Sequence, residues 1–180
     1  CTPAAGANGA AHPACRSPRV EGQPAVTLDD FLARIPKLEL HCHLLGTVRR
    51  ATFTELVHRA QAPISDEEIT AFYTRGEKPV GVLRVLRALD AWLLRTPDDF
   101  HRLTYEYLQD AAAHQVRHAE FFWNPTGTAQ VGGLPYAQAL AGIRRAIRDA
   151  RSDFGISGRL IAAIDREASP EAALEMVQWV

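Results

Sequence analysis

Two histidines separated by one residue, His41 and His43, are the side chains of this sequence best placed to do chemistry. They lie in the segment 37–44 (KLELHCHL), where apolar residues alternate with polar ones as in a β-strand. Residues i and i+2 of a strand point to the same face, with Cα atoms roughly 6.5–7 Å apart. Two imidazoles placed in this way can share one zinc ion, each at about 2.0–2.1 Å. The spacing predicts part of a metal site, and a pair of histidines on a polar strand edge is the alternative.

The position of the pair favours the metal site. His43 ends the predicted strand just before the turn at Gly46, and in a (β/α)8 barrel the carboxyl ends of the strands form the active-site face. A catalytic zinc needs at least three protein ligands, so the others must come from elsewhere in the protein. Strict alternation places Cys42 on the opposite face, and we do not count it as a ligand.

Three acidic residues near predicted strands are further candidates. Glu39 shares the parity of the two histidines and is predicted to orient one of them, unless it is only a strand-end charge. Glu120 lies in a strand predicted to be buried and needs a partner there. Asp165 ends a third strand at the active-site end, where structural pairing with a neighbouring arginine is the alternative.

The elements that position these residues alternate along the chain. Strands are predicted over residues 37–44, 118–123 and 160–165, with four helical segments between the first two, a helix over 135–151, and another helix from Ser169 onward. The run HAEFFW (118–123) has the continuous apolar character of a strand buried on both faces. Alternation of this kind indicates an α/β fold with a parallel sheet and outer helices.

Three strand–helix units are too few for a closed eight-stranded barrel, which needs about 250 residues. We therefore expect residues 27–180 to be the N-terminal portion of a (β/α)8 TIM barrel, truncated at its C-terminus, with extra helices after the first strand. A small open sheet is the alternative. Residues 1–26 are rich in Ala, Gly and Pro without an apolar period, which predicts a disordered leader.

The composition of the chain excludes some classes of binding partner. The 20 Lys and Arg residues balance the 21 Asp and Glu residues, which argues against nucleic acid or a membrane surface as a partner. No apolar run approaches the roughly 20 residues that span a bilayer. The three cysteines include no C-x-x-C pair, so we expect a reducing, cytoplasmic setting rather than a disulfide scaffold.

The segment 35–47 (IPKLELHCHLLGT) resembles the N-terminal signature of the adenosine and adenine deaminase family. That signature closes the first strand of a (β/α)8 barrel, and the runs 107–125 and 160–167 are similar to the segments around the family's second and third strands. The resemblance implies a zinc-dependent hydrolase that releases ammonia from adenosine or a related aminopurine, a small-molecule purine nucleoside or base. It also implies that His41 and His43 are the first two zinc ligands and that Gly46 turns the chain away from the metal. His43, Leu45 and Gly46 are then expected to lie against the substrate.

By the same resemblance, zinc lowers the pKa of a bound water toward about 7 for attack on the amino-bearing carbon. A glutamate then serves as general acid and base. That glutamate, a third histidine ligand, a second catalytic histidine and an aspartate pair are expected beyond Val180. We therefore assign no catalytic residue within the 180 residues and expect them alone to be inactive.

One position departs from the family pattern. The family usually has Asp or Glu just before the glycine of the signature, where it can bond a sugar hydroxyl, and here the position is Leu45. A leucine cannot accept that hydrogen bond. A free base, a modified nucleoside or another aminopurine is then an alternative to adenosine. Otherwise Leu45 merely packs, and another residue binds the ribose.

Two other functions stay open. The first is another hydrolase of the wider amidohydrolase superfamily, which the Pro-Lys-x-Glu-Leu context before His41 disfavours. The second is a non-catalytic truncated barrel that acts only as a binding or interaction protein.

Overall fold

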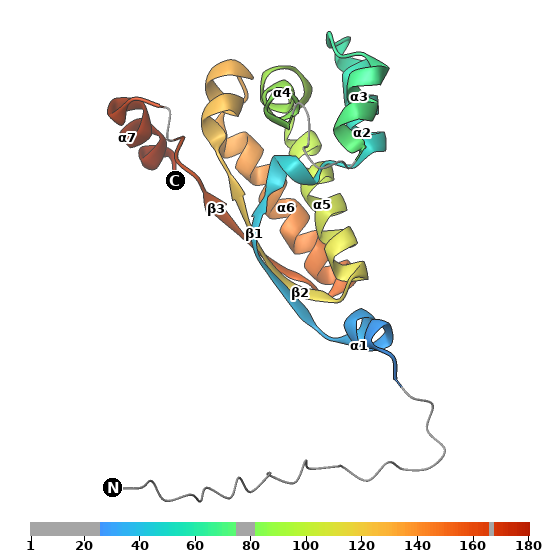
Figure 1. Cartoon of the computed structure of the whole chain (residues 1–180). Coiled ribbons are helices and arrows are strands. Elements are labelled where there is room, and N and C mark those ends of the chain that lie inside the picture. The colour runs from blue at the N-terminus through green and yellow to red at the C-terminus, as the bar shows by residue number, and fades with distance from the viewer. Residues whose placement is uncertain (1–25, 75–81, 166–167) are drawn as a thin grey trace, which may run out of the picture.

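The computed structural model describes residues 26–74, 82–165 and 168–180 (Figure 1). The leader predicted over residues 1–26 therefore lies, apart from Val26, outside the described residues. Along the chain the elements are α1 (Leu28–Arg34), β1 (Lys37–His43), η1 (Leu44–Thr47), α2 (Arg50–Ala60), α3 (Asp66–Tyr73), α4 (Val82–Ala88), η2 (Leu89–Leu93), α5 (Pro97–Ala113), β2 (Val116–Trp123), η3 (Gly127–Val131), α6 (Tyr136–Phe154), β3 (Ser157–Ala162) and α7 (Pro170–Trp179).

The three strands form one parallel sheet in the order β1-β2-β3. This confirms the predicted alternation of strands and helices, and the long first crossover is present as α2, α3, α4, η2 and α5. The predicted bounds of the third strand, 160–165, were wrong. β3 begins at Ser157 because Ser157, Gly158 and Arg159 pair with β2, although none of the three has a strong preference for strands.

Helices α5 and α6 cover one face of the sheet (Figure 1). Ala119, Phe121 and Trp123 of β2 are at most 1% exposed on this face and pack in the hydrophobic core. The two helices approach closely at Gly142, where an added Cβ would lie 2.0 Å from the carbonyl oxygen of Pro97. Only glycine allows this approach, so the α5–α6 layer depends on the residue type at position 142.

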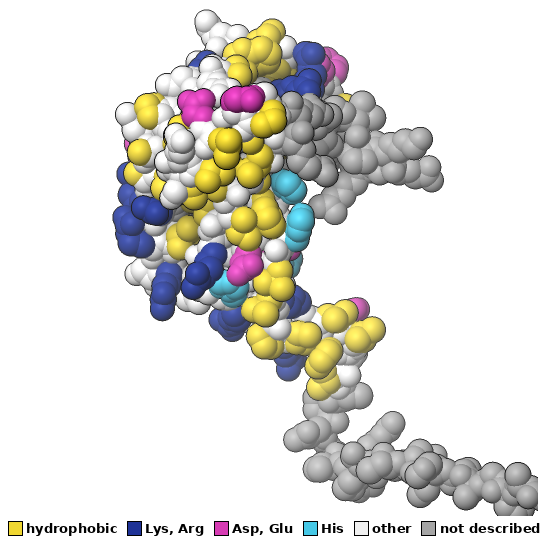
Figure 2. All heavy atoms as spheres, turned by 90° about the vertical axis from the view of Figure 1, so that its left-hand side faces the viewer, with side chains coloured by type: hydrophobic (Ala, Val, Ile, Leu, Met, Phe, Trp, Pro, Cys, Tyr) yellow, Lys and Arg dark blue, Asp and Glu magenta, His cyan; other side chains and the backbone are white. Residues whose placement is uncertain are grey.

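The opposite face of the sheet carries more exposed side chains. Leu38 and Leu40 of β1 are 65% and 56% exposed, and alternate residues of β2 are half-buried. We predicted that β2 is buried on both faces, and for the described residues this is wrong. Helices α5 and α6 cover only the face that carries Ala119, Phe121 and Trp123. In Figure 2, histidine side chains lie beside hydrophobic ones along this side of the molecule.

Helices α2, α3 and α4 lie beyond the carboxyl end of β1, and α1 lies at the opposite end of that strand (Figure 1). Residues of α4, η2 and η3 border the carboxyl ends of β2 and β3. No helix in the described ranges is both long and apolar enough to cross a membrane.

Candidate metal centre

The two histidines of β1 lie side by side on the more exposed face of the sheet. The ring centroids of His41 and His43 are 5.6 Å apart, with an interplanar angle of 61°. Both side chains are exposed, so their ring nitrogens are open to a ligand. The strand therefore brings together the two residues that the sequence singled out as metal ligands.

A β-bulge in β1 separates these histidines from Glu39. The Cα partners on β2 shift between Glu39, opposite Ala119, and Cys42, opposite Phe121, so β1 has one extra residue in this stretch. Leu40 and His41 are both exposed as a result, and Glu39 is half-buried like Cys42. The prediction that Glu39 orients a histidine from the same face was wrong, because the bulge breaks the alternation on which it depended.

The surroundings of Cys42 show on which face of the sheet Glu39 lies. Burial raises the pKa of the Cys42 thiol, the charge of Glu39 adds to the rise, and the neighbouring Tyr107 hydroxyl opposes it. Because Tyr107 belongs to α5, Cys42 and Glu39 lie on the helix-covered side of the sheet. Neither residue shares the face of the two histidines.

Phe122 of β2 packs against both histidines. Its ring centroid lies 4.7 Å from that of His41 and 5.9 Å from that of His43, the residue it faces across the strand pair. This contact limits the rotation of both imidazoles and places an apolar surface beside them. Directly after His43, Leu44 is 0% exposed, so the carboxyl end of β1 is anchored in the core.

The two remaining predicted site residues follow in η1. Leu45 is 8% exposed and packs in the hydrophobic core. Gly46 is exposed, and a Cβ added to it would meet no atom within 4 Å. Packing among the described residues therefore does not require glycine at position 46, and the space beside it is open.

A third histidine, His118, lies on the same face, nearer the amino end of β2. His118 shares a hydrogen bond with the hydroxyl of Ser157 at 2.7 Å, and its other ring nitrogen lies 3.4 Å from Oε1 of Glu120. This answers the predicted need of Glu120 for a partner. Since both ring nitrogens of His118 have partners, the contacts give it a structural role.

The donor set fits one half of a zinc site. Two imidazole nitrogens on one strand match the preference of zinc for histidine, and a catalytic site needs at least one more protein ligand. Across residues 26–74, 82–165 and 168–180, no group of three or more His, Cys, Asp or Glu side chains could hold a metal ion. Among the described residues, His41 and His43 would thus supply two ligands of such a site.

Sequence reasoning missed a cavity of about 670 Å³ beyond the carboxyl ends of β2 and β3. Asn124, the first residue after β2, and Asp165, three residues after β3, line it together with Asp90 of η2. Burial raises the pKa of Asp90 to about 6, although a hydrogen bond from the Thr128 hydroxyl to its Oδ1 at 2.7 Å opposes the shift. The sequence carried a signal for this burial, because the leucines at positions 83, 86, 89 and 93 have helical spacing and Asp90 follows Leu86 by four residues on the same face.

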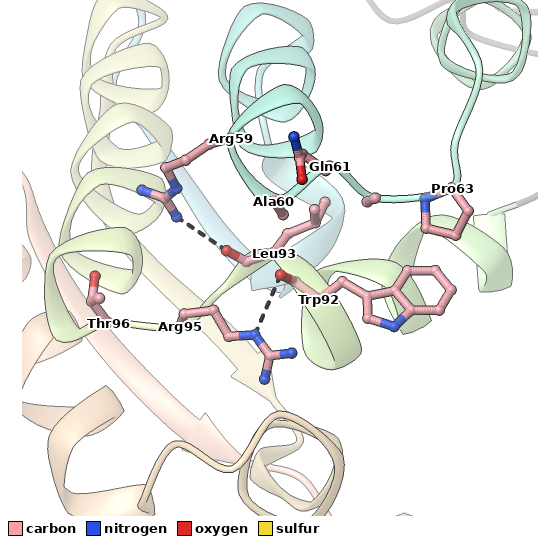
Figure 3. Close-up of a pocket in the computed structure, with 9 residues that line it drawn as sticks. Arg59, Ala60, Gln61, Pro63, Trp92, Leu93, Arg95 and Thr96 are labelled. Carbon is pink, nitrogen blue, oxygen red and sulfur yellow. Dashed lines mark hydrogen bonds between the residues drawn. The ribbon is translucent and has the colours of Figure 1, made fainter.

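Two arginines hold η2 in place at its carboxyl end (Figure 3). Arg59 of α2 donates to the Leu93 carbonyl at 3.2 Å and to Asp99 at 2.8 Å, and Arg95 donates to the carbonyls of Trp92 and Ala91. These bonds satisfy carbonyl groups that lack partners at the end of a helix. They fix the backbone that carries Asp90 and Trp92. The two arginine side chains that line the pocket of Figure 3 thus already donate hydrogen bonds to protein groups.

Comparison with known proteins gives a consistent picture. Residues 36–180 match the family model "Adenosine deaminase". The chain is 34% identical over 162 residues to an adenine deaminase from Chlorobium luteolum, with 85% of this chain and 46% of that protein covered. It is also 34% identical over 151 residues to an uncharacterized deaminase of Schizosaccharomyces pombe. The chain spans about half the length of the curated relatives it matches.

Solved structures agree with this match. A zinc-bound amidohydrolase from Burkholderia ambifaria superposes with a TM-score of 0.81 at 58% identity, covering 90% of this chain and 45% of that one. Adenine deaminase from Arthrobacter aurescens gives a TM-score of 0.67 at 32% identity, covering 79% and 44%. These neighbours are TIM-barrel amidohydrolases, so the predicted fold class, the N-terminal part of a (β/α)8 barrel, is confirmed.

Proposed function

The chain belongs to the adenosine deaminase family, and from this premise we propose that it forms part of a zinc-dependent enzyme that hydrolyses an aminopurine and releases ammonia. The observation that carries the proposal is the pair of imidazoles at the carboxyl end of the first strand, whose ring centroids are 5.6 Å apart. That end is the active-site face of a (β/α)8 barrel. The zinc in the Burkholderia ambifaria neighbour supports zinc as the metal.

In this proposal His41 and His43 hold the metal through one nitrogen each. A zinc ion supplies Lewis-acid chemistry and allows water to act as a nucleophile near neutral pH. Phe122 restrains both rings by contact, which reduces the conformational entropy that they would lose on binding a metal. It also excludes water from one side of the pair.

The substrate contacts proposed for η1 differ between its residues. The open space at Gly46 supports an approach of the purine beside His43. Leu45 is buried, so the reading in which it merely packs is the one that its environment supports. We further propose that residues 27–180 form one portion of the barrel domain. We also propose a cytoplasmic location for the protein, which cell fractionation tests.

The test uses the full-length product of the gene that contains this sequence. We would measure bound zinc by plasma mass spectrometry and ammonia release from adenine, adenosine and N6-substituted adenines. The proposal predicts one zinc per chain and ammonia release from at least one of these compounds. Both are lost in His41→Ala.

His58→Ala is the matched control, because His58 has a side chain 64% exposed on α2, away from the sheet. It should keep both zinc and activity. A His41→Ala protein with full zinc content and full activity would refute the assignment. A wild-type protein without zinc that releases no ammonia would instead support a non-catalytic barrel or another hydrolase.

A further inference from the structure

Helix α6 carries a row of arginines on the side that borders α7. Arg144, Arg148 and Arg151 follow one another at spacings of four and three residues, which places them on one face of the helix. All three are exposed. Arg151 lies in the last turn, where the helix dipole favours a cation. Arg144 and Arg148 lie before that turn, so the dipole does not account for them.

Two adjoining cavities form a groove beside these residues, which we call the α6–β3 groove. Arg144 and Arg148 line a cavity of about 450 Å³, and Arg144 lines another of about 420 Å³ together with Arg159 of β3. Tyr136 and Leu140 line both cavities. Each volume is within the range of small-molecule pockets, roughly 300–1,000 Å³. Three exposed arginines thus border a groove of the size that small molecules occupy.

The guanidinium groups of Arg144, Arg148 and Arg159 have no hydrogen-bond or ion-pair partner among residues 26–74, 82–165 and 168–180. Arg145, the next residue along α6, instead pairs with Asp98 of α5. In Figure 2, dark blue Lys and Arg side chains gather along the left edge of the molecule. The three arginines of the groove are therefore available to a ligand.

The two carboxylates of α6 do not compensate this positive charge. Asp149 and Asp153 lie 2.7 and 2.8 Å from side chains of α5, on the other flank of the helix. Glu120 of β2, which is opposite Arg159 in the sheet, lies 3.4 Å from a ring nitrogen of His118. Like charges four residues apart on a helix repel each other, and a bound anion would offset this repulsion.

A triphosphate group has the chemistry that this groove would recognise. The planar guanidinium of arginine donates two parallel hydrogen bonds to one phosphate, a geometry that lysine lacks. Arg144 and Arg148 are one helical turn apart, a rise of about 6 Å, so different phosphates of one chain can reach each of them. An acidic peptide spreads its carboxylates along an extended chain, which fits two compact cavities less well.

We propose that the α6–β3 groove binds a triphosphate group, free or carried by a nucleoside, through Arg144, Arg148 and Arg159. Helix α6 covers the face of the sheet opposite to the face of His41 and His43. The groove is therefore a second site, separate from the proposed metal centre, and its ligand does not depend on the proposed deaminase function.

Isothermal titration calorimetry on the full-length gene product tests this site with tripolyphosphate, ATP and sulfate. Wild type should bind one tripolyphosphate per chain, at least tenfold more tightly than sulfate. Arg144→Gln and Arg148→Gln should each weaken tripolyphosphate binding about tenfold, because each removes a charge-assisted pair of hydrogen bonds. Both side chains are exposed, so neither substitution disturbs the core.

Two controls separate this groove from general charge attraction and from the metal centre. Arg145→Gln removes the same charge from the neighbouring residue, which pairs with Asp98 on the other flank of α6, and should bind tripolyphosphate like wild type. His41→Ala should also bind tripolyphosphate like wild type, because no zinc ion takes part in the site.

Equal affinities for ATP and tripolyphosphate would support the site with the triphosphate group alone as the ligand. ATP binding at least tenfold tighter than tripolyphosphate binding, and weakened by Arg144→Gln, would support it with a nucleotide as the source.

Three results would overturn the proposal. These are no binding of tripolyphosphate by wild type, equal weakening by Arg145→Gln and Arg144→Gln, and loss of binding in His41→Ala. A peptide of six glutamates that binds more tightly than tripolyphosphate would overturn it in favour of an acidic protein partner.

Discussion

Replacing Asp90 with asparagine should change how the stability of the protein depends on pH. Burial raises the pKa of Asp90 to about 6 from its ordinary value of 3.8. In the pH range between these values the folded protein holds a proton that the unfolded chain has released. The free energy of unfolding therefore contains a contribution from Asp90 that is complete below pH 3.8 and is lost as the pH rises through about 6.

The size of the effect follows from the difference between the two pKa values, which corresponds to about 3 kcal/mol of unfolding free energy. The groups around Asp90 are the Thr128 hydroxyl of η3 and, on the same cavity wall, Arg84, Arg87 and Asp165. They are common to wild type and Asp90→Asn, so the difference between the two proteins isolates Asp90. Relative to wild type, the asparagine variant should gain up to about 3 kcal/mol between pH 4 and pH 7.

Urea unfolding of both full-length proteins, followed by tryptophan fluorescence at several pH values from 4 to 7, measures this difference. Asp66→Asn serves as the control and should track wild type over the whole range, because its side chain is 81% exposed. A difference between wild type and Asp90→Asn that stays constant within about 0.5 kcal/mol would refute the reasoning, since surface substitutions act on that scale.

Three further outcomes follow from the contacts. Phe122→Ala should lower zinc affinity roughly tenfold in a competition titration with a chelator, because both imidazoles lose the ring that restrains them. Gly142→Ala should lower the free energy of unfolding in urea by about 1–3 kcal/mol, since its Cβ would overlap the Pro97 carbonyl. Asp99→Ala should lower the free energy of unfolding by about 1–3 kcal/mol in the same assay, because Asp99 is 6% exposed and accepts the backbone N–H groups of Arg95 and Thr96 as well as a bond from Arg59. Unchanged zinc affinity in Phe122→Ala would contradict the role of that ring. An unchanged free energy of unfolding in Gly142→Ala or Asp99→Ala would contradict the corresponding contact.

The placement of His41 and His43 on one face of β1 was predictable because its signal is local. Two histidines at i and i+2 before a glycine need only the strand period and the strand end to be placed on one face. The strand–helix order was predictable for the same reason, since apolar periodicity and caps are read within a few residues.

The rest depended on contacts between distant parts of the chain. Glu39 was placed on the wrong face because a bulge arises from pairing between β1 and β2, which the sequence of one strand does not reveal. Ser157 and Gly158 lie in a strand because β2 supplies their hydrogen-bond partners. Asp90 gained its environment from Thr128 and Gly127, nearly forty residues away in the sequence, and periodicity alone gave no means to find that contact.

The most direct test of the account is an X-ray diffraction experiment on zinc-loaded crystals of the full-length gene product, with data collected on both sides of the zinc absorption edge. The account predicts one anomalous peak about 2.0–2.1 Å from a ring nitrogen of His41 and, at the same distance, from one of His43. A zinc peak bound by other residues, with both histidines more than bonding distance away, would contradict it.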